Sequence, residues 1–220
     1  MLDFEALRQR MVDHQLRPSE ITDPDVIRAF STLPREQFVA VVEQPFAYGD
    51  KELMMSAAAP NRRMMAPVQL ARLVHALPRG ENVRAMVIGC GSGYSAAILA
   101  RLAGTVIAVE EDENLAISAQ QRLAALAIGN VSVVQGKLTD GSPGGSPYDA
   151  ILIDGAVEVV RPSLVSQLKP EGRLATIVRG EAISRAVICE RTGDDGADWP
   201  LFEAWAPLLP GFERKREFVF

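Results

Sequence analysis

The hydrophobic pattern of this chain changes character near residue 83. Before that point, apolar residues recur at helical spacing over residues 3–15, which predicts an amphipathic helix. The run Thr22-Asp23-Pro24-Asp25 predicts the start of a second helix, because it supplies a capping side chain and a proline for the first turn. An irregular region then reaches Pro67, which opens a third helix. A loop of that length is usually functional, so we expect this region to bind substrate.

From residue 83 onward, short apolar runs alternate with helical stretches. Strands are expected near 84–88, 105–109, 131–134, 150–153 and 173–178, and helices near 92–103, 113–127 and 158–168. This alternation predicts an α/β fold with a doubly wound, mostly parallel sheet. Strands over 184–190 and 201–207, joined by a polar turn over 191–200, predict a C-terminal antiparallel hairpin, to which residues 218–220 would add an edge strand.

The stretch Val87-Ile88-Gly89-Cys90-Gly91-Ser92-Gly93-Tyr94 predicts a strand, a tight turn and the first turn of a helix. Glycine adopts positive φ and lets a ligand approach the backbone closely. The next predicted strand ends in Glu110. A glycine turn followed by a strand that ends in a carboxylate suits a nucleoside, because the ribose hydroxyls need a hydrogen-bond acceptor.

Two kinds of nucleoside cofactor fit such a turn. A dinucleotide site needs a third glycine three residues after Gly91, where this chain has Tyr94, so that interpretation is weakened. The spacing of Gly89, Gly91 and Gly93 resembles the first motif of S-adenosylmethionine methyltransferases. The run Tyr148-Asp149-Ala150-Ile151-Leu152-Ile153-Asp154 resembles the fourth strand of that fold, whose end faces the methyl donor.

Composition narrows the class of protein further. With 220 residues and 48% hydrophobic content, the chain can bury a full core as a single α/β domain. A net charge of -5 with scattered basic residues argues against nucleic acid as a partner. The acidic N-terminus and the lack of any apolar run near 18 residues predict a cytoplasmic protein without a membrane partner. Cys90 and Cys189 are expected to be reduced thiols.

A narrower resemblance covers residues 20–180. It rests on Asp23-Pro24, Ala29-Phe30, Leu33-Pro34-Arg35-Glu36-Gln37-Phe38-Val39, Ala47-Tyr48-Gly49-Asp50, the glycine turn, Asn130-Val131 with Gly136, and Gln167-Leu168-Lys169-Pro170-Glu171-Gly172-Arg173-Leu174. In this order and spacing, these runs resemble the protein-L-isoaspartate (D-aspartate) O-methyltransferase family. The resemblance implies methyl transfer from S-adenosylmethionine to the α-carboxyl of an isoaspartyl residue. The damaged linkage then closes to a succinimide and reopens, partly as normal aspartate.

The resemblance also implies site residues. The cofactor-binding set is Gly89, Cys90, Gly91, Gly93, Glu110, Glu111, Gly136, Lys137 and Asp154. When the proline of the family's Gly-Gln-Thr-Ile-Ser-x-Pro segment is placed on Pro67, the substrate-binding positions become Asn61, Arg62, Arg63 and Met65. The active-site serine of the family falls on Met65, so no catalytic side chain is assigned, and no metal site is predicted. The chemistry needs alignment and exclusion of water more than an acid or a base.

Several positions depart from the family pattern. Arg63 replaces Thr, Met65 replaces the serine, Val87 and Lys137 replace acids, and Asp154 replaces Thr. Met64 and Met65 are more typical of core packing than of substrate contact, whereas the two arginines would suit a carboxylate acceptor. Three hypotheses stay open: an enzyme acting on a damaged isoaspartyl protein or peptide, an enzyme of the same fold with another acceptor such as a small molecule, and a non-catalytic cofactor-binding interaction module. As domain organisation we expect one domain over 1–220, with a helical and substrate segment (1–80), a cofactor-binding core (81–180) and a hairpin (181–220).

Overall fold

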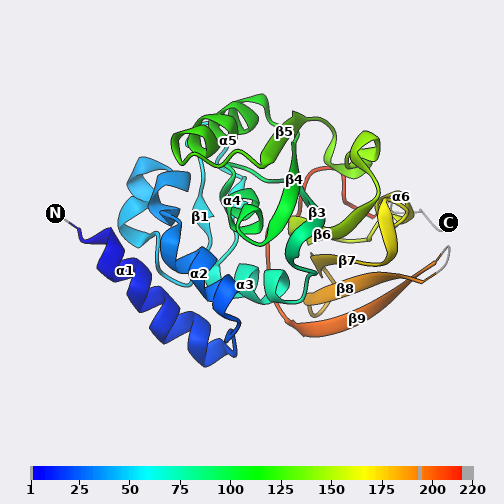
Figure 1. The fold of residues 1–220 in the computed structure, drawn as a ribbon, viewed down its shortest axis with the longest axis horizontal. Coiled ribbons are helices and arrows are strands. Elements are labelled where there is room, and N and C mark those ends of the chain that lie inside the picture. The colour runs from blue at the N-terminus through cyan, green and yellow to red at the C-terminus, as the bar shows by residue number, and fades with distance from the viewer. Residues whose placement is uncertain (1, 193–194, 215–220) are drawn as a thin grey trace.

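The fold is built on a seven-stranded sheet (Figure 1). The structure is a computed structural model that describes residues 2–192 and 195–214. The strands are β3 (Gly80–Ile88), β4 (Ala103–Glu110), β5 (Val131–Gln135), β6 (Tyr148–Val157), β7 (Leu168–Val178), β8 (Arg185–Thr192) and β9 (Asp195–Glu203). A separate pair of short strands, β1 (Leu53–Met54) and β2 (Arg63–Met64), forms a small hairpin before the main sheet.

The strand order is β5-β4-β3-β6-β7-β8-β9. The first five strands of this order run parallel, and β8 and β9 pair antiparallel at the edge. The direction of winding therefore reverses between β3 and β6, which is where open α/β sheets bind ligands at the carboxyl ends of their strands. The predicted fold class, a doubly wound and mostly parallel sheet with a C-terminal antiparallel hairpin, is confirmed.

Helices pack on both faces of the sheet. They are α1 (Phe4–Met11), α2 (Pro24–Thr32), α3 (Pro67–His75), α4 (Tyr94–Ala100), α5 (Glu113–Ala125) and α6 (Pro162–Val165). The side chain of Asp23 caps α2 by accepting hydrogen bonds from two backbone amides of its first turn, as its position before Pro24 predicts. A π-helical segment, Val12–Leu16, continues α1, and the region before α3 contains 3₁₀ turns over Arg35–Phe38 and Val41–Phe46.

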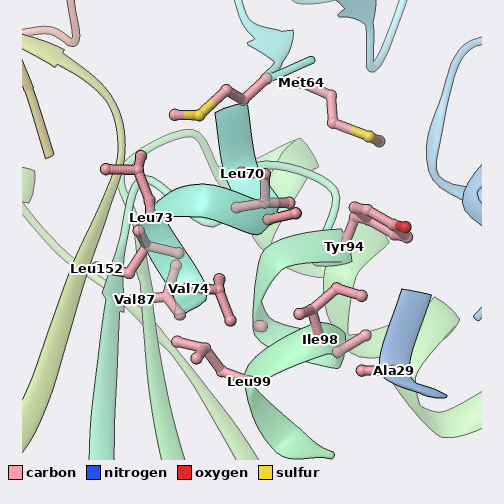
Figure 2. Packing of buried hydrophobic residues seen from close by; sticks show 14 of the residues in the cluster. Ala29, Met64, Leu70, Leu73, Val74, Val87, Tyr94, Ile98, Leu99 and Leu152 are labelled. Atoms are coloured by element: carbon pink, nitrogen blue, oxygen red, sulfur yellow. The ribbon is translucent and has the colours of Figure 1, made fainter. Parts of the chain in front are cut away.

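Alternate residues of the central strands feed two hydrophobic clusters, one on each face of the sheet. Val87 joins the cluster under α3 and α4, and its neighbour Ile88 joins the cluster under α6. Figure 2 shows Val87 beside Val74 of α3 and Leu152 of β6. Val87 is completely buried, and burial of its side chain contributes about 1.5–3 kcal/mol. At the position where the family has an acid, this chain has a packing residue.

Two predicted elements differ from the structure. The stretch 191–200 is not a polar turn, because β8 continues to Thr192 and β9 already begins at Asp195. Residues 198–200 are exposed, and no hydrophobic alternation marks this part of β9 in the sequence. The helix expected over 158–168 is reduced to the four residues of α6. The edge strand expected over 218–220 lies outside the described residues. Within the described part of the chain, none of the helices has both the length and the hydropathy to cross a membrane.

Candidate active site

The glycine turn lies at the carboxyl end of β3, between the ends of β4 and β6. Ile88 pairs with Val109 of β4 and with Ile153 of β6, so Gly89 begins the turn beside Glu110 and Asp154. The φ angles of Gly89 and Gly91 are +76° and +55°, in the left-handed region that side chains disfavour. Gly93 has φ +99°, and a Cβ there would lie 3.1 Å from the Cβ of Ala119. Gly93 therefore serves the packing of α4 against α5.

Glu110 is fully buried and links the end of β4 to the turn. Its Oε2 accepts a 2.7 Å hydrogen bond from the backbone amide of Gly91. Its Oε1 accepts from the amides of Glu111 and Asp112 at 2.9 and 3.0 Å. These three amides fix the carboxylate in one orientation at the switch point of the sheet. The role of Glu110 as an acceptor for ribose hydroxyls stays a prediction.

Arg62 forms an ion pair with the carboxylate of Glu110. Its Nη1 lies 2.6 Å from Oε1 of Glu110 and its Nη2 lies 2.7 Å from Oε2, a bidentate pair. The Arg62 side chain is only 12% exposed. Burial disfavours its charge, but the hydrogen bonds to Glu110 and the negative charge of Glu110, together with smaller charge effects of Cys90 and Asp154, outweigh that cost and raise the pKa of Arg62. Glu110 thus accepts five hydrogen bonds, whereas a carboxylate has about four lone-pair sites.

Two apolar side chains cover the glycines. The sulfur of Met55 accepts a 3.4 Å hydrogen bond from the amide of Ser92, and a Cβ on Gly91 would lie 2.3 Å from that sulfur. Leu209 covers the other side, because a Cβ on Gly89 would lie 3.1 Å from its Cδ1. The amide of Leu209 donates a 2.9 Å hydrogen bond to the carbonyl of Ala156, so the segment that carries it is paired with the end of β6.

A cluster of buried polar groups lies around Asp154. Oδ1 of Asp154 has no hydrogen-bond partner among the described residues, and neither has Nη1 of Arg35. Burial raises the pKa of Asp154 to about 6, against the opposing influence of the positive charges of Arg35 and Arg62. The Arg35 guanidinium stacks 4.9 Å from the ring centroid of Tyr94. Such partly satisfied buried groups are typical of functional sites.

The other predicted site residues do not all converge on the turn. Asn61, Glu111 and Lys137 are exposed. Arg63 donates a 3.2 Å hydrogen bond to the carbonyl of Glu52 and lies 3.9 Å from Glu43, so it points away from Glu110. Met65 is buried in the main cluster, as its type favours, and its carbonyl accepts from Arg35 at 2.7 Å. Cys90 is buried in the turn, where burial raises the pKa of its thiol. The amide of Gly136 donates to the carbonyl of Glu110 at 3.0 Å.

Three contributors to the site were not predicted from the sequence: Met55, Leu209 and the fully buried Arg35. Arg35 lies in the run that carries the family resemblance, and that was the signal available for it. Met55 and Leu209 reach the turn only through tertiary contacts, and no local pattern marks either of them.

Comparison with known proteins identifies the family of this chain. Residues 7–197 match the family described as protein-L-isoaspartate(D-aspartate) O-methyltransferase. The chain belongs to this family. A protein-L-isoaspartate O-methyltransferase of Methanoregula boonei is 37% identical over 186 residues, which is 84% of each chain. Protein-L-isoaspartate O-methyltransferase 1 of Rhodopseudomonas palustris is 38% identical and covers 94% of this chain and 88% of its own.

Solved structures of this family share the fold. A protein-L-isoaspartate O-methyltransferase structure superposes with a TM-score of 0.81 at 24% identity, over 93% of this chain and 66% of that chain. A Plasmodium falciparum protein solved with S-adenosyl-L-homocysteine gives a TM-score of 0.75 at 18% identity, over 95% of this chain and 99% of that chain. The resemblance drawn from the sequence is confirmed, and with it the class of an S-adenosylmethionine-dependent O-methyltransferase.

Proposed function

We propose that this protein transfers a methyl group from S-adenosylmethionine to the α-carboxyl group of isoaspartyl residues in damaged proteins or peptides. The observation that supports this most strongly is Glu110, a buried carboxylate at the end of β4 that is held by the amide of Gly91 in the glycine turn. Membership of the isoaspartyl methyltransferase family gives that arrangement its chemistry.

The residues around the turn fit the methyl donor. Glu110 would accept hydrogen bonds from the ribose hydroxyls, and the glycines at Gly89 and Gly91 have no side chain of their own to block a close approach. Gly136 and Lys137 would lie on the adenine side, after β5. When bound, S-adenosylmethionine supplies a methyl group already activated on a sulfonium. The protein's task is then to align the acceptor carboxylate and to exclude water.

The acceptor would be held by the segment before α3. We assign Asn61, Arg62 and Arg63 to this role because a guanidinium pairs well with a carboxylate. Residues 1–80 then form the substrate segment of a single domain, and 81–180 form its cofactor core. Both cysteines of the chain are free and buried, which suits the reducing conditions of the cytoplasm.

A second candidate function keeps the donor and changes the acceptor. Asp154 follows Ile153, the last residue of β6 that pairs with β3, and an ionised Asp154 would repel an acceptor carboxylate at that place. Met65 also brings no hydroxyl to the position of the family's serine. An acceptor with a neutral hydroxyl or amine would avoid that repulsion.

A pair of peptides separates the two functions. The protein is incubated with tritiated S-adenosylmethionine and either an isoaspartyl peptide or its normal aspartyl counterpart, with Glu110→Ala as the variant that lacks the proposed ribose acceptor. We expect label in the isoaspartyl peptide alone and loss of that label in Glu110→Ala. Equal labelling of both peptides, or of neither, would contradict the proposed acceptor.

A further inference from the structure

The ion pair between Arg62 and Glu110 engages the same carboxylate that the ribose of the methyl donor would bind. Both oxygens of Glu110 are engaged by Arg62, and each also accepts at least one backbone amide. Ribose hydroxyls bind a carboxylate by donating to it. Because five hydrogen bonds are already donated to Glu110, its carboxylate has no free lone pair for the ribose hydroxyls. The methyl donor therefore cannot bind Glu110 while Arg62 is paired with it.

Arg62 and Met55 come from one structural unit. They are the first and last residues of the loop 55–62 that joins β1 to β2, and the amide of Met55 donates a 3.5 Å hydrogen bond to the carbonyl of Arg62. We call residues 55–62 the covering loop. Arg62 lies on Glu110 and Met55 lies on Gly91, so a single displacement of this loop would uncover both groups. The hairpin that carries the loop pairs Leu53 with Met64 and Met54 with Arg63, and the carbonyl of Met54 also accepts a 2.9 Å hydrogen bond from the amide of Ala40.

A second anion is close to Arg62. Nη2 of Arg62 is 3.5 Å from the carbonyl of Gly89, which begins the turn beside Asp154 across the β3–β6 pairing. The charge of Arg62 acts on Asp154, and Oδ1 of that residue has no hydrogen-bond partner among the described residues. A buried guanidinium that leaves one carboxylate needs another. Asp154, whose carboxylate interacts electrostatically with Arg62, is the group that we infer would supply it.

We propose that Arg62 sets the affinity of this protein for its methyl donor by competing with the ribose hydroxyls for Glu110. This inference rests on the proposed function for the identity of the ligand. The donor binds by displacing Arg62, and the covering loop moves with it. Arg62 is then an affinity-determining residue of the donor site, in addition to any contact that it makes with the acceptor.

Calorimetric titration with S-adenosylhomocysteine tests the competition without catalysis. We expect Arg62→Gln to bind this ligand at least about tenfold more tightly than the unmodified protein, because glutamine cannot form the charged bidentate pair. Arg79→Gln is the matched control: Arg79 is also partly buried and pairs with a carboxylate, Asp23, at 2.8 Å, but at the far end of α3. Its removal should leave the affinity unchanged.

Glu110→Gln completes a double-mutant cycle. In that background Arg62→Gln should bring no gain in affinity, because the competition requires the carboxylate. Thermal melts with and without ligand monitor folding, and Arg62→Lys, which keeps a charge but cannot form the fork, should give an intermediate affinity.

The outcomes separate this inference from the proposed function. If the unmodified protein binds the ligand as tightly as Arg62→Gln, or if the gain persists without Glu110, the competition is wrong and the proposed function stands. If both proteins bind with the expected difference but isoaspartyl peptides are not methylated, the acceptor is wrong and the competition stands. If neither protein binds the ligand, both proposals are wrong.

Discussion

Nη2 of Arg35 donates a 2.7 Å hydrogen bond to the backbone carbonyl of Met65. Nε of the same guanidinium donates to the carbonyl of Ala47 at 2.8 Å, and the whole side chain is buried. The two carbonyls belong to separate parts of the N-terminal segment, and the buried guanidinium of Arg35 bridges them by hydrogen bonds. The position of Met65 at the start of α3 is therefore fixed by a buried cation rather than by the Met65 side chain alone.

Replacement of Arg35 by Met should lower the stability of the protein. It leaves the carbonyls of Ala47 and Met65 buried without their donors, which costs about 2–5 kcal/mol in total. Urea denaturation measures the loss. Arg28→Met, on the exposed face of α2, is the control and should change the free energy of unfolding by less than about 0.5 kcal/mol. A similar loss of unfolding free energy in both variants would show that the buried hydrogen bonds of Arg35 do not account for its contribution to stability.

Met65→Ser restores the family's side chain at the proposed acceptor position. We expect a stability loss of about 2–4 kcal/mol from the emptied core volume, together with a several-fold rise in isoaspartyl methylation. Met64→Ser is the matched comparison, since Met64 is equally buried one residue away. The test is the rate of methylation of the isoaspartyl peptide with tritiated S-adenosylmethionine, measured under conditions in which both variants remain folded. A rate in Met65→Ser no higher than in Met64→Ser would remove residue 65 from the acceptor site.

Asp154 should make stability depend on pH. Its pKa is about 6 in the folded protein, raised by burial above the ordinary value of 3.8. The folded protein is therefore favoured while Asp154 is protonated, and that advantage is lost as the pH rises from about 4 through 6. The full difference is on the order of 3 kcal/mol. Asp154→Asn stays neutral, so its free energy of unfolding, measured in urea from pH 4 to 7, should lack this component. If stability depends on pH in the same way in Asp154→Asn, the raised pKa of Asp154 is not the source of this dependence.

Gly91→Ala should destabilise the protein through its backbone more than through crowding. The φ of +55° costs a side-chain-bearing residue about 1–2 kcal/mol, and the new Cβ would lie 2.3 Å from the flexible end of Met55. The double variant Gly91→Ala with Met55→Ala relieves the contact but not the backbone. Because Met55→Ala removes a buried side chain and is itself destabilising, the reference is Met55→Ala alone, and the double variant should still melt at a lower temperature than that reference. Equal melting temperatures of the double variant and Met55→Ala would mean that the contact with Met55 is the whole effect.

The core of the fold could be predicted from the sequence because its signals are local. The strands around Ile88, Val109 and Ile153 are short apolar runs, and the glycine turn and the Asp23 cap are marked by residue type. The β9 strand could not be predicted over 195–200, because the residue types there show no hydrophobic alternation. Pro200 there argues against a central strand, but β9 is an edge strand and tolerates it.

The site was predictable in its parts but not in its pairing. Glu110 and Arg62 were both identified as functional candidates, one for the ribose and one for the acceptor. That they bind each other depends on how the hairpin of β1 and β2 folds over the sheet, which joins residues 48 positions apart. No spacing rule covers such a contact, because it is set by tertiary packing and not by the period of a helix or a strand.

The pairing of Leu209 with the end of β6 has a consequence for biosynthesis. Gly89 and Gly155 are covered by a side chain that follows Gly89 by 120 positions in the chain. Chains are synthesised from the N-terminus, and long-range contacts form late. During translation the parallel strands can therefore pair while Gly89 and Gly155 still lack the cover of Leu209. A nascent chain halted before Leu209 would leave this apolar edge of the sheet open to chaperones.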